Sequence, residues 1–205
     1  GGSRNYASVF SNNGSAQSIT GADGITLTGG ATGGINGEGN YASISVAVGS
    51  QTIAVGSDGI SISGGSGGPA DRDNYGSIFQ GGLAGTSQTV TVDGGGNIVL
   101  QGGSSTGLNV GAGNGSTAFL TANGDSQLVE FTGAGSSISI VGGSIGSRNN
   151  AGISSENGSQ TLRGSVAANA PTIALTGGSG GVAGEGNGAV ISAINGVQTV
   201  SSKNL

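Results

Sequence analysis

The chain contains no cysteine, methionine, tryptophan or histidine, and only two of its 205 residues are proline. The missing cysteine and histidine exclude disulfides, Cys/His metal sites, cysteine nucleophiles and every histidine-dependent catalytic mechanism. Aromatic residues make up 3% of the chain and all hydrophobic residues 33%, which is too little for a thick core of large side chains. Any core must be thin and built from small apolar residues.

Charge is equally scarce, since charged residues are 7% of the chain and the formal net charge is −5. The basic residues are scattered along the sequence: Arg4, Arg72, Arg148, Arg163 and Lys203. Nucleic-acid binding needs a clustered basic surface, so we expect no nucleic-acid partner. No apolar run approaches the length of a membrane span, so we expect no membrane insertion. Asp71 with Asp73, or Glu130 with Glu156, could approach each other as a carboxylate pair for glycoside hydrolysis. With only ten acids in the chain and no cleft built from them, we expect no enzymatic activity.

Glycine is abundant, with 48 residues, and isoleucine, valine and threonine recur in short alternating runs. The glycines lack the every-third-residue pattern of collagen. The chain also lacks the high net charge of a typical disordered segment. Alternation of apolar and polar residues over about four to eight positions is typical of half-buried β-strands. The sequence therefore predicts many short strands.

A unit of three such runs, separated by turns, recurs six times. Glutamine marks the second run of each unit, at intervals of 34, 37, 39, 33 and 38 residues. Self-similarity with a period of this length is the sequence signature of a repeat array. The chain is thus a single array over residues 1–205. Its repeats are approximately 1–28, 29–63, 64–101, 102–141, 142–176 and 177–205.

The alternation also assigns the faces of the strands, because side chains two residues apart point to the same side. In the second repeat the inward residues are Ala42 and Ile44, then Ile53, then Ile60 and Ile62. Three inward-facing strands per repeat predict an all-β fold, a parallel β-solenoid of about six coils. Connections between parallel strands are right-handed by default, so we expect a right-handed coil. Glycines at the corners are expected to supply positive φ angles.

In-register stacking of the coils aligns identical residues in columns. We interpret the amide columns as ladders of the kind that stabilise cross-β stacks, with the glutamines pointing inward at a corner. The tyrosines are expected to form a stacking ladder on the outer face. The asparagine column is Asn5, Asn40, Asn74, Asn149 and Asn187; the glutamine column is Gln17, Gln51, Gln88, Gln127, Gln160 and Gln198; the tyrosine column is Tyr6, Tyr41 and Tyr75.

One acidic column is a candidate metal site. Asp23, Asp58 and Asp93 each precede a glycine in the same turn of the first three repeats. Stacking would place their carboxylates about 5 Å apart, and calcium is the hard cation that would bridge them. Asp-Gly is also ordinary turn chemistry, and the fourth repeat has Ala134 at this place, so we prefer the turn interpretation. We therefore predict no cofactor, with calcium as the only candidate.

The repeat unit resembles a known family. Its pattern is Asn-Tyr-Ala-Ser-Ile at 40–44, Gln-Thr-Ile-Ala-Val at 51–55 and Asp-Gly-Ile-Ser-Ile-Ser-Gly-Gly at 58–65. It is similar to the repeat regions of bacterial surface and secreted proteins of the filamentous-haemagglutinin type, and more weakly to curlin-type amyloid subunits. The first resemblance covers nearly the whole chain. It implies a right-handed β-solenoid, export to the cell surface or the medium, and a role as adhesin, biofilm-matrix protein or filament.

Two functions are compatible with these features. Repeat arrays normally close with atypical polar caps, and neither the first nor the last repeat looks capped. Open β-edges recruit further strands, so we expect self-association into an extracellular homopolymer. The alternative is a β-solenoid stalk or binding segment of a larger bacterial adhesin. Its loops, at 66–73 and 104–115, would then contact glycans or host surfaces.

Overall fold

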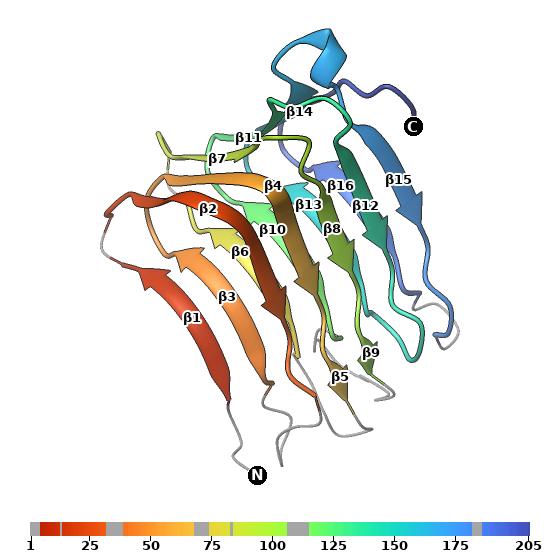
Figure 1. The fold of residues 1–205 in the computed structure, drawn as a ribbon. Coiled ribbons are helices and arrows are strands. Elements are labelled where there is room, and N and C mark those ends of the chain that lie inside the picture. The colour runs from red at the N-terminus through yellow and green to blue at the C-terminus, as the bar shows by residue number, and fades with distance from the viewer. Residues whose placement is uncertain are drawn as a thin grey trace.

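The computed structural model describes residues 5–12, 14–31, 39–67, 74–82, 84–105, 115–181 and 186–205. These residues form an all-β solenoid, in which each strand lies beside the equivalent strand of the next coil (Figure 1). All strand pairings within the described residues are parallel. There are five complete coils and the first two strands of a sixth. The predicted parallel β-solenoid is therefore confirmed.

The first face of the solenoid is a six-stranded sheet that takes one strand from each coil. Its strand order follows the chain, because each coil is laid down beside the one before it. The strands are β1 (Tyr6–Ser11), β3 (Tyr41–Val46), β6 (Gly76–Gln80), β10 (Ala118–Ala122), β13 (Ala151–Ser155) and β16 (Ala189–Ala193).

The second and third faces belong to one nine-stranded sheet. They are joined because each of the first two coils has one long, bent strand that runs along both faces. In the later coils a turn divides this segment into two strands. The long strands are β2 (Gln17–Thr28) and β4 (Gln51–Ser63). On the second face follow β7 (Ser87–Val92), β11 (Ser126–Phe131), β14 (Ser159–Gly164) and β17 (Gln198–Val200), and on the third face β8 (Ile98–Gln101), β12 (Ser137–Val141) and β15 (Thr172–Thr176).

Three short elements lie outside these faces. β5 (Ser66–Gly67) pairs with β9 (Ser104–Ser105), directly after the third face of their coils. A single 3-10 turn, η1 (Ala167–Asn169), lies between β14 and β15. It fills the corner between the second and third faces of the fifth coil.

The register places equivalent residues of neighbouring coils opposite each other. Ile44 lies opposite Ile78 in the first sheet, and Gln127 lies opposite Gln160 on the second face. The pairing of β2 with β4 shifts register between Ile19 and Gly24, where the two long strands bend from the second face to the third. The glutamine column predicted from the spacing is continuous from Gln17 to Gln198.

The core is a thin column of small apolar side chains that the three faces enclose. The inward residues of the central coils are fully buried, and the largest of them is Phe131. Alternate residues along the central strands β6, β7 and β11 are buried and half-buried in turn, as a strand with one face toward a core requires. The fully buried large side chains are Phe131, Ile53, Ile60, Ile62, Ile78, Ile98, Leu100, Leu120, Ile138, Ile140, Ile153 and Leu162.

The Gly-Gly pairs lie at the corner after the third face, where most of these positions have no room for a side chain. A methyl group on Gly65 would lie 2.0 Å from the carbonyl oxygen of Gly30, and one on Gly103 would lie 2.0 Å from that of Gly65. None of these paired glycines has a positive φ, so the expectation of positive φ is wrong for them. Positive φ occurs at other turns, such as Gly59 and Gly94. At Gly65, Gly103, Gly143 and Gly178, the second glycines of their pairs, the carbonyl of the preceding coil takes the place of a side chain.

We therefore expect the substitution Gly103→Ala to lower the free energy of unfolding by about 1–3 kcal/mol or more, as overpacking of a rigid site does. The added methyl group would meet the Gly65 carbonyl and the Cβ of Ser116, 2.5 Å away. Gly177→Ala is the matched control, because nothing lies within 4 Å of a methyl group there. Urea unfolding of both variants measures the difference, and equal losses would contradict the steric explanation.

Candidate functional site

The glutamine column is a continuous hydrogen-bonded ladder inside the solenoid. Each Nε2 donates to the Oε1 of the glutamine in the preceding coil, at 2.6 to 2.8 Å. All members except Gln198 are buried. The ladder runs in one direction from Gln198 to Gln17, because every amide presents its nitrogen to the earlier coil and its oxygen to the later one.

The same amides also hold the first and second faces together. The Nε2 of Gln88 donates to the carbonyl oxygen of Thr121 at 3.1 Å, and that of Gln127 donates to Leu120 at 3.4 Å. Both acceptors belong to β10 of the first sheet, whereas the glutamines belong to the second face. Glutamine suits this corner because one side chain supplies two donors and an acceptor at the same distance from the backbone.

The asparagine column uses a different set of bonds from the amide ladder that the spacing suggests. The Oδ1 of Asn40 accepts the backbone N–H of Asn5 at 2.9 Å, and the Oδ1 of Asn187 accepts that of Asn149 at 2.8 Å. In the fourth coil Ser116 takes the asparagine position, and its backbone N–H donates to the Oδ1 of Asn149. Each bond joins a side chain to the backbone of the preceding coil, because the short asparagine side chain keeps its amide close to the main chain.

The tyrosine column lies on the outer face of the first sheet. The rings of Tyr6 and Tyr41 are 5.3 Å apart between centroids and 9° from parallel. The rings of Tyr41 and Tyr75 are 4.8 Å apart and 4° from parallel. These separations match the spacing of neighbouring strands, so the in-register backbone stacks the rings face to face.

The three-carboxylate column expected at Asp23, Asp58 and Asp93 does not form. The backbone N–H of Asp93 donates to the Val55 carbonyl, so Asp93 lies opposite Gly56 rather than Asp58. In the part of the chain that the structure describes, no group of three His, Cys, Asp or Glu residues could hold a metal ion.

Asp93 instead accepts hydrogen bonds from its own turn and from the next coil. Its Oδ1 accepts a hydrogen bond from the hydroxyl of Thr132 at 2.6 Å and another from the backbone N–H of Gly94 at 2.7 Å. These bonds, that from Thr132 first, hold the pKa of the Asp93 carboxyl below its ordinary value, because they stabilise the charged form. This is the Asp-Gly turn chemistry that the sequence also suggested.

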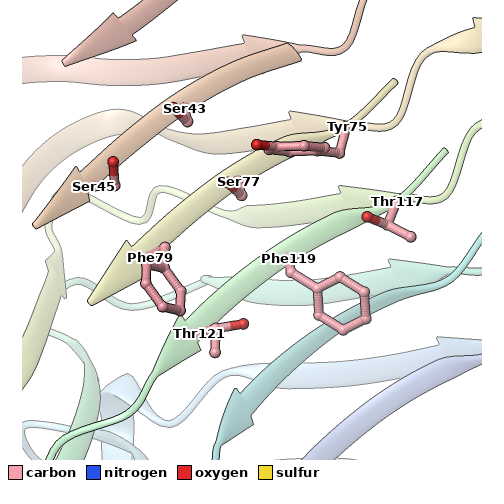
Figure 2. A pocket seen from close by; sticks show the side chains of 8 residues that line it. All are labelled: Ser43, Ser45, Tyr75, Ser77, Phe79, Thr117, Phe119 and Thr121. Atoms are coloured by element: carbon pink, nitrogen blue, oxygen red, sulfur yellow. The ribbon is translucent and has the colours of Figure 1, made fainter. Parts of the chain in front are cut away.

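A hollow on the outer face of the first sheet lies beside the tyrosine column. Its volume is about 340 Å³. The rings of Tyr75, Phe79 and Phe119 surround it, with Ser77 between them and Ser43 on the neighbouring strand (Figure 2). The sequence reasoning missed the phenylalanines of this face. Their signal was their spacing, because Phe79 lies four residues after Tyr75 and therefore points to the same side of the strand.

The loops proposed as binding segments are described only at their ends. Ser66, Gly67 and Ser104 lie in the short strands β5 and β9 and pair across them. Residues 68–73 and 106–114 lie outside the described residues. Among the described residues no helix is long and apolar enough to cross a membrane.

A scan against models of protein families finds no matching family, and searches of curated proteins and of solved structures find no match. The class that the fold defines is a parallel β-solenoid repeat protein. The similarity of its repeats to the filamentous-haemagglutinin type stays a prediction.

We expect Gln88→Leu to lower the free energy of unfolding by about 2–4 kcal/mol. The substitution removes the Gln88 donor from the buried Oε1 of Gln51. It also removes the Gln88 acceptor from the Nε2 of Gln127, which keeps only its 3.4 Å bond to Leu120. A buried unsatisfied group costs about 1–3 kcal/mol and a lost hydrogen bond about 0.5–1.5 kcal/mol.

The matched control is Gln198→Leu at the exposed end of the ladder. It removes one ladder bond, to the Oε1 of Gln160, instead of two, so a smaller loss than for Gln88→Leu is expected. Urea unfolding at low protein concentration compares the two variants. Equal destabilisation would show that the buried ladder bonds contribute no more to the free energy of unfolding than the exposed one does.

Proposed function

We propose that this chain is an extracellular structural protein that forms filaments by stacking end to end. The last coil of one copy meets the first coil of the next, with the strands parallel and in register. The observation that supports this proposal is that the two open edges of the described array match each other in both apolar and polar groups.

The edges expose residues of the kind that is buried in every central coil. Val9 on β1 is 55% exposed, whereas its equivalents Ile78 and Leu120 are fully buried. At the other edge Leu175 on β15 is 45% exposed, whereas its partner Ile140 is fully buried. Removing this apolar surface from water is favourable by about 25 cal/mol per Å², and a further coil is the surface that fits it.

The polar groups at the edges are complementary because the ladders have a direction. At the last coil the Oε1 of Gln198 receives no hydrogen bond from a described residue. At the first coil the Nε2 of Gln17 has no earlier glutamine, and it donates instead to the carbonyls of Val9 and Ser45 at 3.3 and 3.0 Å. Stacking one copy on another would bring the Oε1 of Gln198 in one copy close to the Nε2 of Gln17 in the next.

The backbone of the asparagine column shows the same match. In the described residues the backbone N–H of Asn187 has no acceptor, whereas that of Asn149 donates to the Asn187 side chain. The Oδ1 of Asn5 is the equivalent acceptor at the first coil. A head-to-tail contact of this kind is heterologous and does not close on itself, so it generates an open filament rather than a dimer.

The composition supports the extracellular setting. A chain without cysteine or methionine has no thiol or thioether that could be oxidised, which suits a long-lived material outside the cell. A cell-surface layer or a biofilm matrix is the setting in which a filament of this composition fits best.

We expect the purified chain to form unbranched filaments in a concentration-dependent way, as seen by electron microscopy and sedimentation. Val9→Lys and Leu175→Lys should each abolish filaments, because the junction would have to desolvate a charge. Both side chains are exposed in the single array, so both variants are expected to fold. Mixing the two variants should give dimers only, since each retains one intact edge.

Val99→Lys is the matched control. Val99 is 39% exposed on the outer side of β8, away from both edges, and filaments should persist. Monodisperse wild-type monomers at high concentration would refute the proposal, as would equal inhibition by Val99→Lys.

A further inference from the structure

The aromatic residues of the chain are concentrated on one surface. The sequence has three tyrosines and four phenylalanines. One of them, Phe131, is buried in the core. The other six lie on the outward side of the first sheet, which we call the aromatic face: Tyr6, Tyr41, Tyr75, Phe10, Phe79 and Phe119.

The strand register arranges this face in three columns that run along the solenoid axis. The first column contains the stacked tyrosine rings. The central column is a row of small side chains, Ser8, Ser43 and Ser77, which ends at Phe119. The third column contains Phe79. The serine row is therefore a low strip with tyrosines on one side and with Phe119 across its end.

The hollow of about 340 Å³ lies on this strip, over β3, β6 and β10. The rings of Tyr75, Phe79 and Phe119 stand around Ser77 (Figure 2). All three residues are half-buried and line the hollow. Ligand sites of this kind combine aromatic walls with a few polar groups.

The hydroxyl groups of the hollow have hydrogen-bonding capacity to spare. In the described part of the chain the side chains of Ser45, Ser77 and Thr117 have no hydrogen-bond partner, although all three line the hollow. The hydroxyl of Ser43 donates to Ser8 at 3.1 Å and retains acceptor capacity. A ligand rich in hydroxyl groups can pair with them.

The aromatic face carries no charge on its described strands. None of the six strands of the first sheet contains an acidic or basic residue. A stacking platform for single-stranded nucleic acid also needs a positive groove, and this face has none on a chain of net charge −5. The face therefore has no group that would pair with a charged ligand, and a neutral ligand fits it best.

We propose that the aromatic face binds a neutral polysaccharide. The apolar faces of its sugar rings pack on Tyr75, Phe79 and Phe119, and its hydroxyls pair with those of Ser45, Ser77 and Thr117. A flat apolar partner would bury these hydroxyls without partners, which is unfavourable. A polysaccharide supplies the partners and the apolar contact together. This site is independent of the end-to-end contacts.

The repeat itself supplies the test variants. Ser77 precedes Phe119 in its column, Ser45 precedes Phe79, and Thr117 follows Tyr75, so Phe119→Ser, Phe79→Ser and Tyr75→Thr introduce residues that the sheet already holds at equivalent positions. The triple variant is therefore expected to fold. Thermal unfolding checks that it does.

The matched control is Val99→Ser on the outer side of the third face. Its neighbours in register are Ser61 and Ser139, so it also replaces an exposed apolar residue by one that its column already contains. It lies on the nine-stranded sheet, whereas the aromatic face belongs to the six-stranded one. It tests whether any loss of exposed apolar surface reduces binding.

The experiment is affinity electrophoresis of the full 205-residue chain in native gels. The gels contain hydroxyethylcellulose, glucomannan or xyloglucan, with anionic alginate in parallel. We expect retardation by at least one neutral polysaccharide and none by alginate. The triple variant should lose more than about tenfold in affinity, because aromatic anchors dominate binding, and Val99→Ser should bind normally.

Running the assay in the Val9→Lys background separates this result from filament formation, because Val9 points to the core side of β1. The proposal is overturned if no neutral polysaccharide in the panel retards the chain. Equal loss in the control variant or equal retardation by alginate also overturns it. If only the self-association of the chain changes in the triple variant, the face is a contact between copies and the proposal is wrong.

Discussion

Every coil must repeat the path of its neighbour at the spacing of one β-ladder, about 4.8 Å, and this requirement shapes all other features of the chain. Parallel strands meet it easily along the faces, where their hydrogen bonds run from coil to coil. The corners are harder, because there the backbone turns and its polar groups leave the ladder. The residues that recur most strictly, the glutamines and the Gly-Gly pairs, are found at these corners.

The two recurring corner types solve this problem in opposite ways. At the glutamine corner a polar side chain fills the space, and its amide bonds to both the preceding coil and the first sheet, as Gln88 does with Gln51 and Thr121. At the Gly-Gly corner no side chain fits, because the carbonyl of the preceding coil occupies its place, as Gly65 shows against Gly30. A thin core can contain buried amides because identical neighbours always supply the partners.

The outer surfaces are not restricted in this way, and they differ from face to face. The first sheet holds the aromatic rings and no charge, whereas the second face carries the ion pair of Glu130 and Arg163. Because the strands are in register, an outward side chain on one strand lies in a column with the equivalent side chains of the neighbouring coils. A repeat protein of this kind can therefore build an extended surface from single side chains, and it retains two open edges for contacts along its axis.

The sequence by itself determined the coil, the three strands per repeat and the inward residues, because a period of two along each strand and the glutamine period are local patterns that any parallel stack must preserve. Only the tertiary structure decided which atoms meet at the corners. Ile25, Ile60 and Ile98 lie 8, 9 and 10 residues after their glutamines, so Asp93 shifts out of line with Asp58 although both precede a glycine. The side chain-to-backbone bonds of the asparagines and the hollow around Ser77 likewise depend on distances between coils, which no single repeat contains.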